Sequence, residues 1–257
     1  MKINAIKKMN SKYKIQFDNN QTIITYDNVI LENNLLYDKK ITSEILNKIK
    51  EDTNYYENYN KILKKISRKL KSEWEVRKEL ENNQVKQYDI EKIINKLKNL
   101  NLLNDREFAK AYTNDRMSLS MDGPYKIKQF LEINKIDDIF IQEALENFNE
   151  EIIIKRINKI INKKIEANTK DTDYIFKQKM NLYLLNLGYD KQDITNCLNN
   201  VKIDNNNLEK EMIKIYDKLK IKYSGYELNN KLKQKLFSKG FTADQINDFI
   251  NKNSSLI

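Results

Sequence analysis

The chain has 257 residues, with 47 Lys and Arg, 37 Asp and Glu, no His, one Cys, four Gly and one Pro. A hydrophobic fraction of 40% is enough to bury a core, which argues against a chain that is disordered throughout. Without His, the common zinc sites and His-based catalytic triads cannot be built, and the single Cys197 excludes an intramolecular disulfide. The formal net charge of +10 predicts an anionic partner.

The composition also predicts the kind of fold and the compartment. Gly and Pro are so rare that most of the chain is expected to be helical. No segment approaches the roughly 18 apolar residues of a membrane span, and the first ten residues lack the apolar region of a signal peptide. The four glycines never approach the spacing of a phosphate-binding loop. We therefore expect a cytoplasmic, monomeric protein that is not an enzyme, with no membrane contact, catalytic residue, metal or cofactor.

The N-terminal segment has the pattern of a small β-sheet. Tyr13, Ile15 and Phe17 alternate with polar residues, and a second β-branched run follows at 22–26, which predicts a hairpin. Residues 1–9 could supply a third strand. The strand pattern is gone beyond residue 57, and apolar residues then recur at spacings of three and four, which predicts helices. We place the boundary between these regions near residue 55.

The helical part contains an internal repeat. Val85, Ile136, Tyr189 and Phe241 are separated by 51, 53 and 52 residues, and four further apolar columns keep the same offsets. These columns are Leu80, Leu131, Leu184 and Leu236; Val76, Ile127, Met180 and Leu232; Ile90, Ile141, Ile194 and Ile246; and Ile94, Leu145, Leu198 and Ile250. Within each repeat the spacing predicts a helix, a tight turn and a second helix.

Capping residues support the same division. Ser72 with Glu75 and Thr242 with Gln245 have the spacing of capping boxes, and Asp190 can cap an equivalent helix. Gly188 and Gly240 precede Tyr189 and Phe241, where a helix that ends in the left-handed conformation favours Gly. Cys197 falls in an apolar repeat column, so we expect it to be buried rather than reactive.

A further helical stretch precedes each pair, at about 58–70, 105–117, 150–166 and 207–221. We therefore predict a mainly α-helical fold, an elongated array of tandem three-helix repeats with a small N-terminal β-sheet region. The predicted divisions are 1–55 for the β-containing region with its following helix, then 56–103, 104–149, 150–204 and 205–257 for repeats 1 to 4.

Positive charge is concentrated in the first helices of repeats 1 and 3, whereas the first helix of repeat 2 is balanced. A charge run is often only a solvated face, but two basic helices at repeat-related positions can line a stripe for a polyanion or an acidic protein groove. Trp74 and Tyr125 share another column; packing between repeats is the favoured role for Trp74, and a partner contact the alternative. The candidate contact residues are Lys61, Lys64, Lys65, Arg68, Lys69, Lys71, Trp74, Arg77, Tyr125, Lys155, Arg156, Lys159, Lys163 and Lys164.

Three local stretches resemble the RecX family of bacterial regulatory proteins, especially its longer forms from low-GC Gram-positive bacteria. They are SRKLKSEWEVRKEL at 67–80, LLNDREFAKAY at 102–112 and DGPYKIKQFL at 122–131. The chain departs from the family pattern in two places: Lys69 and Lys71 stand where Arg is frequent, and Asp122 stands where a basic residue often precedes Gly-Pro. The repeated three-helix units are similar to the architecture of that family.

The resemblance implies a protein that modulates RecA, the recombinase that coats single-stranded DNA as a helical filament. Family members lie in the groove of that filament, where they impede ATP hydrolysis and strand exchange. The implied partners are RecA and the RecA–DNA filament, in DNA repair, recombination and the SOS response. Two alternatives remain open: a protein that binds single- or double-stranded DNA directly, and a helical scaffold for another partner.

Overall fold

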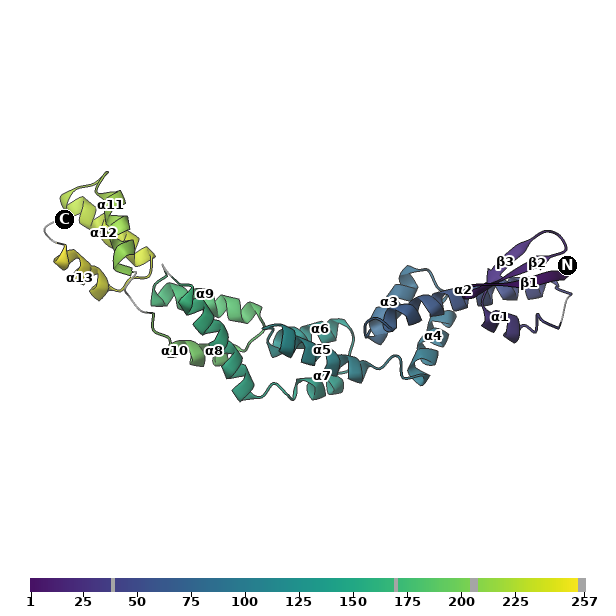
Figure 1. Ribbon diagram of the computed structural model, residues 1–257. Helices are drawn as coiled ribbons and strands as arrows, with labels where there is room; N and C mark the ends of the chain where they lie inside the picture. The colour runs from purple at the N-terminus through teal and green to yellow at the C-terminus, as the bar shows by residue number, and fades with distance from the viewer. Residues whose placement is uncertain (38–39, 169–170, 204–207, 254–257) are drawn as a thin grey trace. The chain divides into compact units, whose positions relative to one another are not determined.

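The computed structural model describes residues 1–257 except 38–39, 169–170, 204–207 and 254–257. The described residues form a small antiparallel β-sheet followed by helices, so the predicted mainly α-helical fold is confirmed (Figure 1). The chain divides into two compact bodies, Met1–Ala109 with Asn134–Asp137, and Lys110–Ile133 with Asp138–Ile257. Each body is described by itself below.

The sheet has three antiparallel strands in the order β1-β2-β3, with bounds Ile3–Met9, Lys12–Phe17 and Thr22–Thr25. The predicted hairpin and the third strand from residues 1–9 are both present. Ile6 pairs with Ile15, and Tyr13 pairs with Thr25. Ile15 and Phe17 are buried on one face, as their alternation predicts.

Helices α1 (Asp27–Glu32) and α2 (Ser43–Ile66) follow the sheet and contact each other. Thr42 caps α2 by accepting a hydrogen bond from the backbone N–H of Ile45. The first helix of repeat 1 was predicted over 58–70, and both limits are wrong, because α2 starts 15 residues earlier and ends at Ile66. The break expected at residue 55 therefore lies inside a continuous helix. Side chains from the sheet through residue 103 also share one hydrophobic core.

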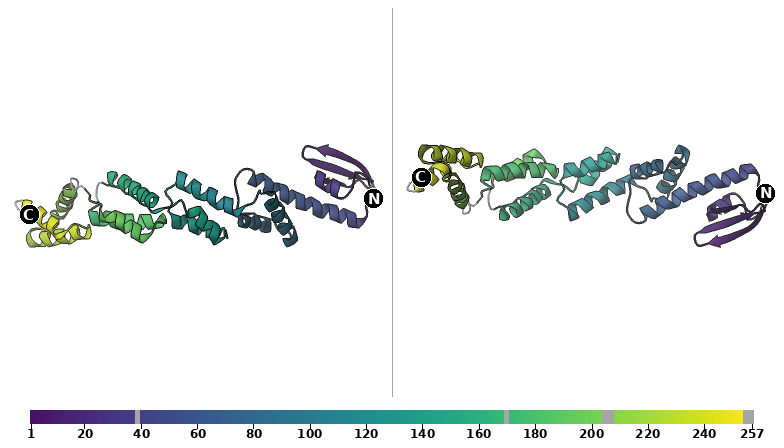
Figure 2. Two further views of the ribbon diagram at one scale, coloured as in Figure 1. Left: turned by 90° about the horizontal axis from the view of Figure 1, so that it is seen from below. Right: turned by 90° about the horizontal axis from the view of Figure 1, so that it is seen from above.

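The remaining helices fall into the predicted groups of three (Figures 1 and 2). Repeat 1 continues from α2 into α3 (Glu73–Asn82) and α4 (Gln87–Asn99). Repeat 2 has α5 (Asp105–Leu119), α6 (Pro124–Ile133) and α7 (Asp138–Leu145). Repeat 3 has α8 (Glu150–Glu166), α9 (Asp173–Asn186) and α10 (Lys191–Asn199). Repeat 4 has α11 (Leu208–Leu219), α12 (Gly225–Ser238) and α13 (Ala243–Lys252).

The repeat columns form the cores of these groups. Of the 20 side chains in the five columns, 18 are buried, and the exceptions are Leu145 and Ile250, which are half-buried. Cys197 is buried with the core of repeat 3, as expected. The capping boxes at Ser72 and Thr242 are both present, and Asp190 caps α10.

The second helix of each repeat ends at a residue in the left-handed conformation. These residues occupy one repeat column and have φ angles of 57° at Gln84, 57° at Lys135, 86° at Gly188 and 81° at Gly240. Where Gly188 turns the chain, the backbone N–H of Tyr189 donates to the carbonyl of Leu184. The N–H of Val85 and that of Phe241 make the equivalent bonds to Leu80 and Leu236. This is a Schellman-type helix end, which explains why an apolar column follows the left-handed residue.

In repeats 1 and 3, the hydroxyl residue just before the second helix makes a hydrogen bond to the next repeat. Its partner there is the residue just before the left-handed position. The hydroxyl of Ser72 donates to Asn134 Oδ1 (3.1 Å), and the hydroxyl of Thr172 donates to the carbonyl of Lys239 (3.1 Å). The same hydroxyls cap their own helices, α3 and α9. Asn134 and Lys239 occupy the same repeat column, one residue before the left-handed position. Each hydroxyl therefore caps the N-terminus of one helix and joins two repeats.

At the equivalent place between repeats 2 and 3, the hydrogen bonds join backbone atoms of the segment before α6 to backbone atoms of the turn after α9. The N–H of Gly123 donates to the carbonyl of Leu187 (2.6 Å), and the N–H of Tyr125 donates to that of Gly188 (3.0 Å). A Cβ atom added at Gly123 would collide with the carbonyl group of Gly188, and one at Gly188 would collide with the backbone of Lys126. The two glycines are therefore required by close approach.

Replacing Gly188 with Ala should lower the free energy of unfolding by more than about 2 kcal/mol, since the left-handed conformation alone costs roughly 1–2 kcal/mol and the new Cβ also collides with Lys126. Gly225→Ala is the matched control, because Gly225 has φ of 53° but open space around it. It should lose only about 1 kcal/mol. Urea denaturation followed by circular dichroism measures both, and equal losses would contradict the role of close approach.

Candidate binding surface

The basic run at 61–71 is divided between a helix and a connection. Lys61, Lys64 and Lys65 lie on α2, which ends at Ile66. Arg68, Lys69 and Lys71 lie in the segment between α2 and α3, so the prediction of one basic helix over the whole run is wrong. Helix α2 ends there without a Gly or Pro, and this is why the sequence did not mark the boundary.

Half of these cations already have acidic partners. Lys61 pairs with Glu57 (3.4 Å), Lys65 pairs with Glu79 (2.5 Å), and Lys71 lies 4.0 Å from Glu75 and from Glu79. By contrast, three exposed cations have no ion pair among the described residues, and we call them the connector patch. They are Lys64, Arg68 and Lys69.

Helix α8 carries a row of exposed lysines. Lys155, Lys159 and Lys163 are spaced by four residues, so they lie along one face of the helix. None of them has an acidic partner among the residues that the structure describes. We call these three residues the α8 lysine row. Lys164 lies beside the row, with its ammonium 4.9 Å from the centre of the Tyr183 ring.

Arg156 lies between members of the row but points inward. Its guanidinium donates to the backbone carbonyls of Met117 (2.8 Å) and Ser120 (2.8 Å) and, more weakly, to that of Asp122 (3.3 Å). Its Nε also lies 3.3 Å from the Tyr189 hydroxyl. Arg156 thus ties α8 to the connection between α5 and α6.

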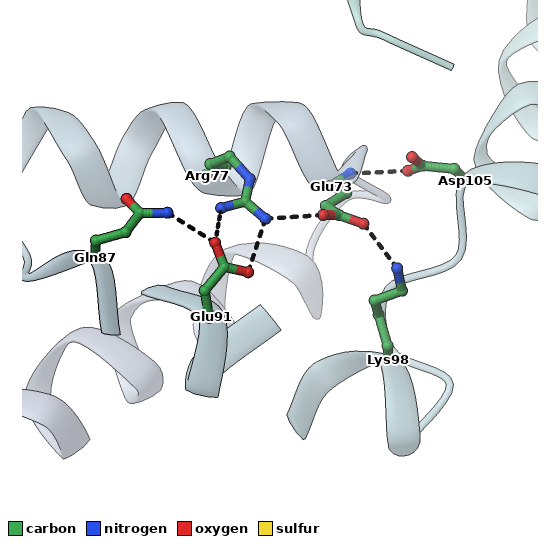
Figure 3. Close-up of polar contacts among 6 residues, drawn as sticks. All are labelled: Glu73, Arg77, Gln87, Glu91, Lys98 and Asp105. Atoms are coloured by element: carbon green, nitrogen blue, oxygen red, sulfur yellow. Dashed lines mark hydrogen bonds and ion pairs between the residues drawn. The ribbon is translucent and has the colours of Figure 1, made fainter. Parts of the chain in front are cut away.

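Arg77 is also held within the protein (Figure 3). Its two terminal nitrogens donate to the two carboxylate oxygens of Glu91 (2.5 and 3.1 Å), and one of them donates to Glu73 (3.1 Å). Gln87 donates to the same Glu91 (2.7 Å). The hydrogen bond to Glu91 is the main cause that raises the pKa of Arg77, and the same bond lowers the pKa of Glu91.

Glu73 extends this network toward repeat 2. Its carboxylate accepts a hydrogen bond from Lys98 (2.9 Å), and its backbone N–H donates to Asp105 (2.8 Å) at the start of α5. Burial would raise the pKa of Glu73, but the hydrogen bonds from Lys98 and Arg77 outweigh it, and the pKa is lowered. For Asp105, burial is the dominant cause and the pKa is raised. The network holds α3, α4 and the start of α5 together.

The two candidate aromatic residues differ in exposure. Trp74 is half-buried, and the ammonium of Lys78 lies 4.5 Å from the centre of its ring. Tyr125 is 56% exposed, and its hydroxyl makes a long hydrogen bond to Asp190 (3.4 Å). The shared repeat column therefore does not give the two residues the same environment.

Sequence reasoning missed Lys12, which stands at the start of β2. It lines a cleft that also contains Lys61 and Lys64 of α2. The cleft is lined by residues about 50 positions apart in the chain, and no local pattern in the sequence predicts that they lie together.

In the part of the chain that the structure describes, no helix is long and apolar enough to cross a membrane, and no cluster of three or more His, Cys, Asp or Glu could hold a metal ion.

The fold and the exposed cations define a repeat protein of tandem three-helix domains with two exposed basic patches, the connector patch and the α8 lysine row. Two family models match the chain: the second three-helix domain of RecX over residues 104–145, and the third three-helix domain of RecX over residues 204–250. These ranges correspond to repeats 2 and 4. By these matches the chain is similar to RecX proteins in two of its four repeats.

Relatives and solved structures show the same similarity over more of the chain. The regulatory protein RecX of Bacillus velezensis is 28% identical over 260 residues, which cover 98% of this chain and 97% of the relative. RecX of Bacillus cereus strain G9842 is 27% identical, covering 97% and 96%. A crystal structure of RecX from Lactobacillus salivarius is 27% identical, with a TM-score of 0.52, covering 56% of this chain and 94% of that one. Another RecX crystal structure, 21% identical with a TM-score of 0.64, shares the fold over 76% of this chain and 97% of that one.

Replacing Arg156 with Ala should destabilise the protein by about 2–3 kcal/mol, because a charged donor is lost and backbone carbonyls are left without their partner. Lys155→Ala, one residue away on the exposed face, should change stability by less than about 0.5 kcal/mol. Urea denaturation of both variants measures the difference. If R156A is as stable as K155A, the inward role of Arg156 is contradicted.

Proposed function

We propose that the protein regulates RecA by binding the RecA filament on single-stranded DNA, where it slows ATP hydrolysis and strand exchange. The observation that carries this proposal is the similarity of nearly the whole chain to RecX regulatory proteins. In this proposal the protein acts by binding, with no catalytic step of its own. It acts as a cytoplasmic monomer of four three-helix repeats that follow the N-terminal sheet.

The α8 lysine row is the surface best suited to a polyanion. Its three ammonium groups are exposed and are not neutralised by carboxylates of the described residues. Neighbouring groups are about 6 Å apart along the helix, since four residues rise by that distance. A filament groove that contains acidic side chains and DNA phosphates offers charges of the opposite sign, which raise the rate of association and fix the orientation.

The connector patch supplies a second basic surface, in the other compact body. Lys64, Arg68 and Lys69 are exposed, and Arg68 can bind a carboxylate or phosphate through two nitrogens at once. In contrast, Arg77 and Arg156 have their guanidinium groups engaged inside the protein. We therefore assign partner binding to the lysine row and the connector patch. The two internal arginines support the fold.

Reversing the charge of the lysine row (K155E, K159E and K163E together) should raise the concentration needed for half-inhibition of RecA by about tenfold or more, because attraction becomes repulsion. The measurement is the RecA ATPase rate on single-stranded DNA. The charge-matched control is Lys231, Lys233 and Lys235→Glu on α12, three exposed lysines that should leave inhibition nearly unchanged. Equal effects of the two triple variants would contradict the surface, and no effect of the unaltered protein on RecA would contradict the function.

Direct DNA binding is the second candidate function, because the same row could take phosphates without RecA. If each of its three lysines binds one phosphate of a single strand, the logarithm of the association constant should fall with the logarithm of salt concentration with a slope of about −2. Fluorescence anisotropy with a labelled oligonucleotide measures this slope. Tight, salt-sensitive DNA binding together with unchanged RecA activity would favour this function over the first.

A further inference from the structure

A polar cleft of about 540 Å³ lies in the N-terminal body, between the β1–β2 turn, the start of α1 and the C-terminal half of α2. This volume is within the range of ligand pockets, roughly 300–1,000 Å³. The cleft is lined by Ser11, Lys12, Tyr26, Asp27, Asn28, Glu57, Asn60, Lys61 and Lys64. The RecA-directed proposal does not use Ser11, Lys12, Asn28 or Asn60.

Two cations in this cleft are free to bind an anion. The ammonium of Lys12 lies 5.0 Å from the centre of the Tyr26 ring and has no carboxylate partner among the described residues. Lys64 is exposed and likewise has no ion pair in the described part of the chain. Lys61 differs, because it pairs with Glu57 at 3.4 Å. The charged side chains that line the cleft are therefore Lys12 and Lys64, the neutralised pair of Lys61 and Glu57, and Asp27, so positive charge exceeds negative charge by one.

The same cleft presents groups that accept hydrogen bonds. Asp27 and Glu57 contribute carboxylates, and the side-chain amide of Asn60 has no hydrogen-bond partner among the residues that the structure describes. These carboxylates repel a phosphate backbone, which has no N–H groups to offer them. A peptide supplies both kinds of group, since its main chain has N–H donors and its Asp or Glu side chains have anionic oxygens.

We propose that this cleft binds an extended acidic segment of a partner protein. Side-chain carboxylates of the segment contact Lys12 and Lys64, and its backbone N–H groups donate to Asp27, Glu57 or Asn60. The α8 lysine row has no carboxylate between its members, so it remains the surface for phosphates. The inference names the chemistry of the bound segment, and it does not depend on whether RecA is the protein that carries it.

The test uses the full-length protein and a fluorescent, end-blocked peptide of alternating Glu, Asp and Gly, with a peptide of Gln, Asn and Gly as the uncharged control. Fluorescence anisotropy at low salt should show saturable binding of the acidic peptide only. Lys12→Gln and Lys64→Gln should each weaken that binding by about threefold, and the double variant by about tenfold, as expected for exposed ion pairs. Lys231→Gln on α12 is the matched control, because this exposed lysine lies outside the cleft and outside the α8 lysine row, and it should leave the binding unchanged. Thermal melts of all variants confirm that they remain folded.

Three outcomes would overturn the inference: no saturable binding of the acidic peptide, equal binding of the uncharged peptide, or equal weakening by Lys231→Gln. A short oligothymidylate gives a fourth test. If Lys12→Gln and Lys64→Gln weaken its binding as much as that of the peptide, the cleft binds phosphates instead. No RecA is present in these measurements, so failure here leaves the RecA proposal untouched, and the ATPase experiment can fail while this one succeeds.

Discussion

The left-handed residue that ends the second helix of each repeat is the constraint on which the rest of the repeat depends. At Gln84, Lys135, Gly188 and Gly240 the chain leaves one helix and turns back into the next, and a buried apolar residue follows at once. In repeats 2, 3 and 4 the residue just before the left-handed position supplies an acceptor: the side-chain oxygen of Asn134 and the backbone carbonyls of Leu187 and Lys239. A group of the preceding repeat donates a hydrogen bond to each of them, so the end of this helix also forms the joint to the neighbouring repeat.

Two arginines are held inside the protein, whereas most of the exposed and unpaired cations are lysines. Arg77 and Arg156 each satisfy several acceptors at once, a task that suits the planar guanidinium with its five donors. The lysines of the α8 row keep their ammonium groups in water. The positive charge of +10 is therefore not all available to a partner, and the part that is available lies mainly on lysines. An interface built on such groups is expected to depend strongly on salt.

Local periodicity was sufficient to predict the helices from α3 onward and the apolar columns that they bury, because a helix buries residues three and four positions apart. The capping boxes and the two left-handed glycines of the repeat column were predictable for a similar reason, because their hydrogen bonds join residues only three to five positions apart. The start of α2 was missed, since the segment from Ser43 is rich in polar residues and its buried face packs on a sheet far away in the sequence. The partners of Arg156 lie 33 to 39 residues away, and the cleft at Lys12 is lined by segments even farther apart. Such contacts follow from tertiary packing and have no local signature.

The hydrogen bonds at Gly123 and Gly188 join main-chain atoms, and this determines which positions near them can accept substitutions during evolution. A hydrogen bond between peptide groups does not depend on the side chains that surround it, so it restricts only the two positions where a Cβ would collide. Exposed neighbouring residues can change in size and charge without breaking these bonds, whereas Arg156 and Tyr189 link repeats 2 and 3 through their side chains and are restricted as well. An insertion or deletion of one residue in the turn would instead displace the acceptor. In a protein joined in this way, evolution can exchange surface residues freely while the spacing of the repeats stays fixed.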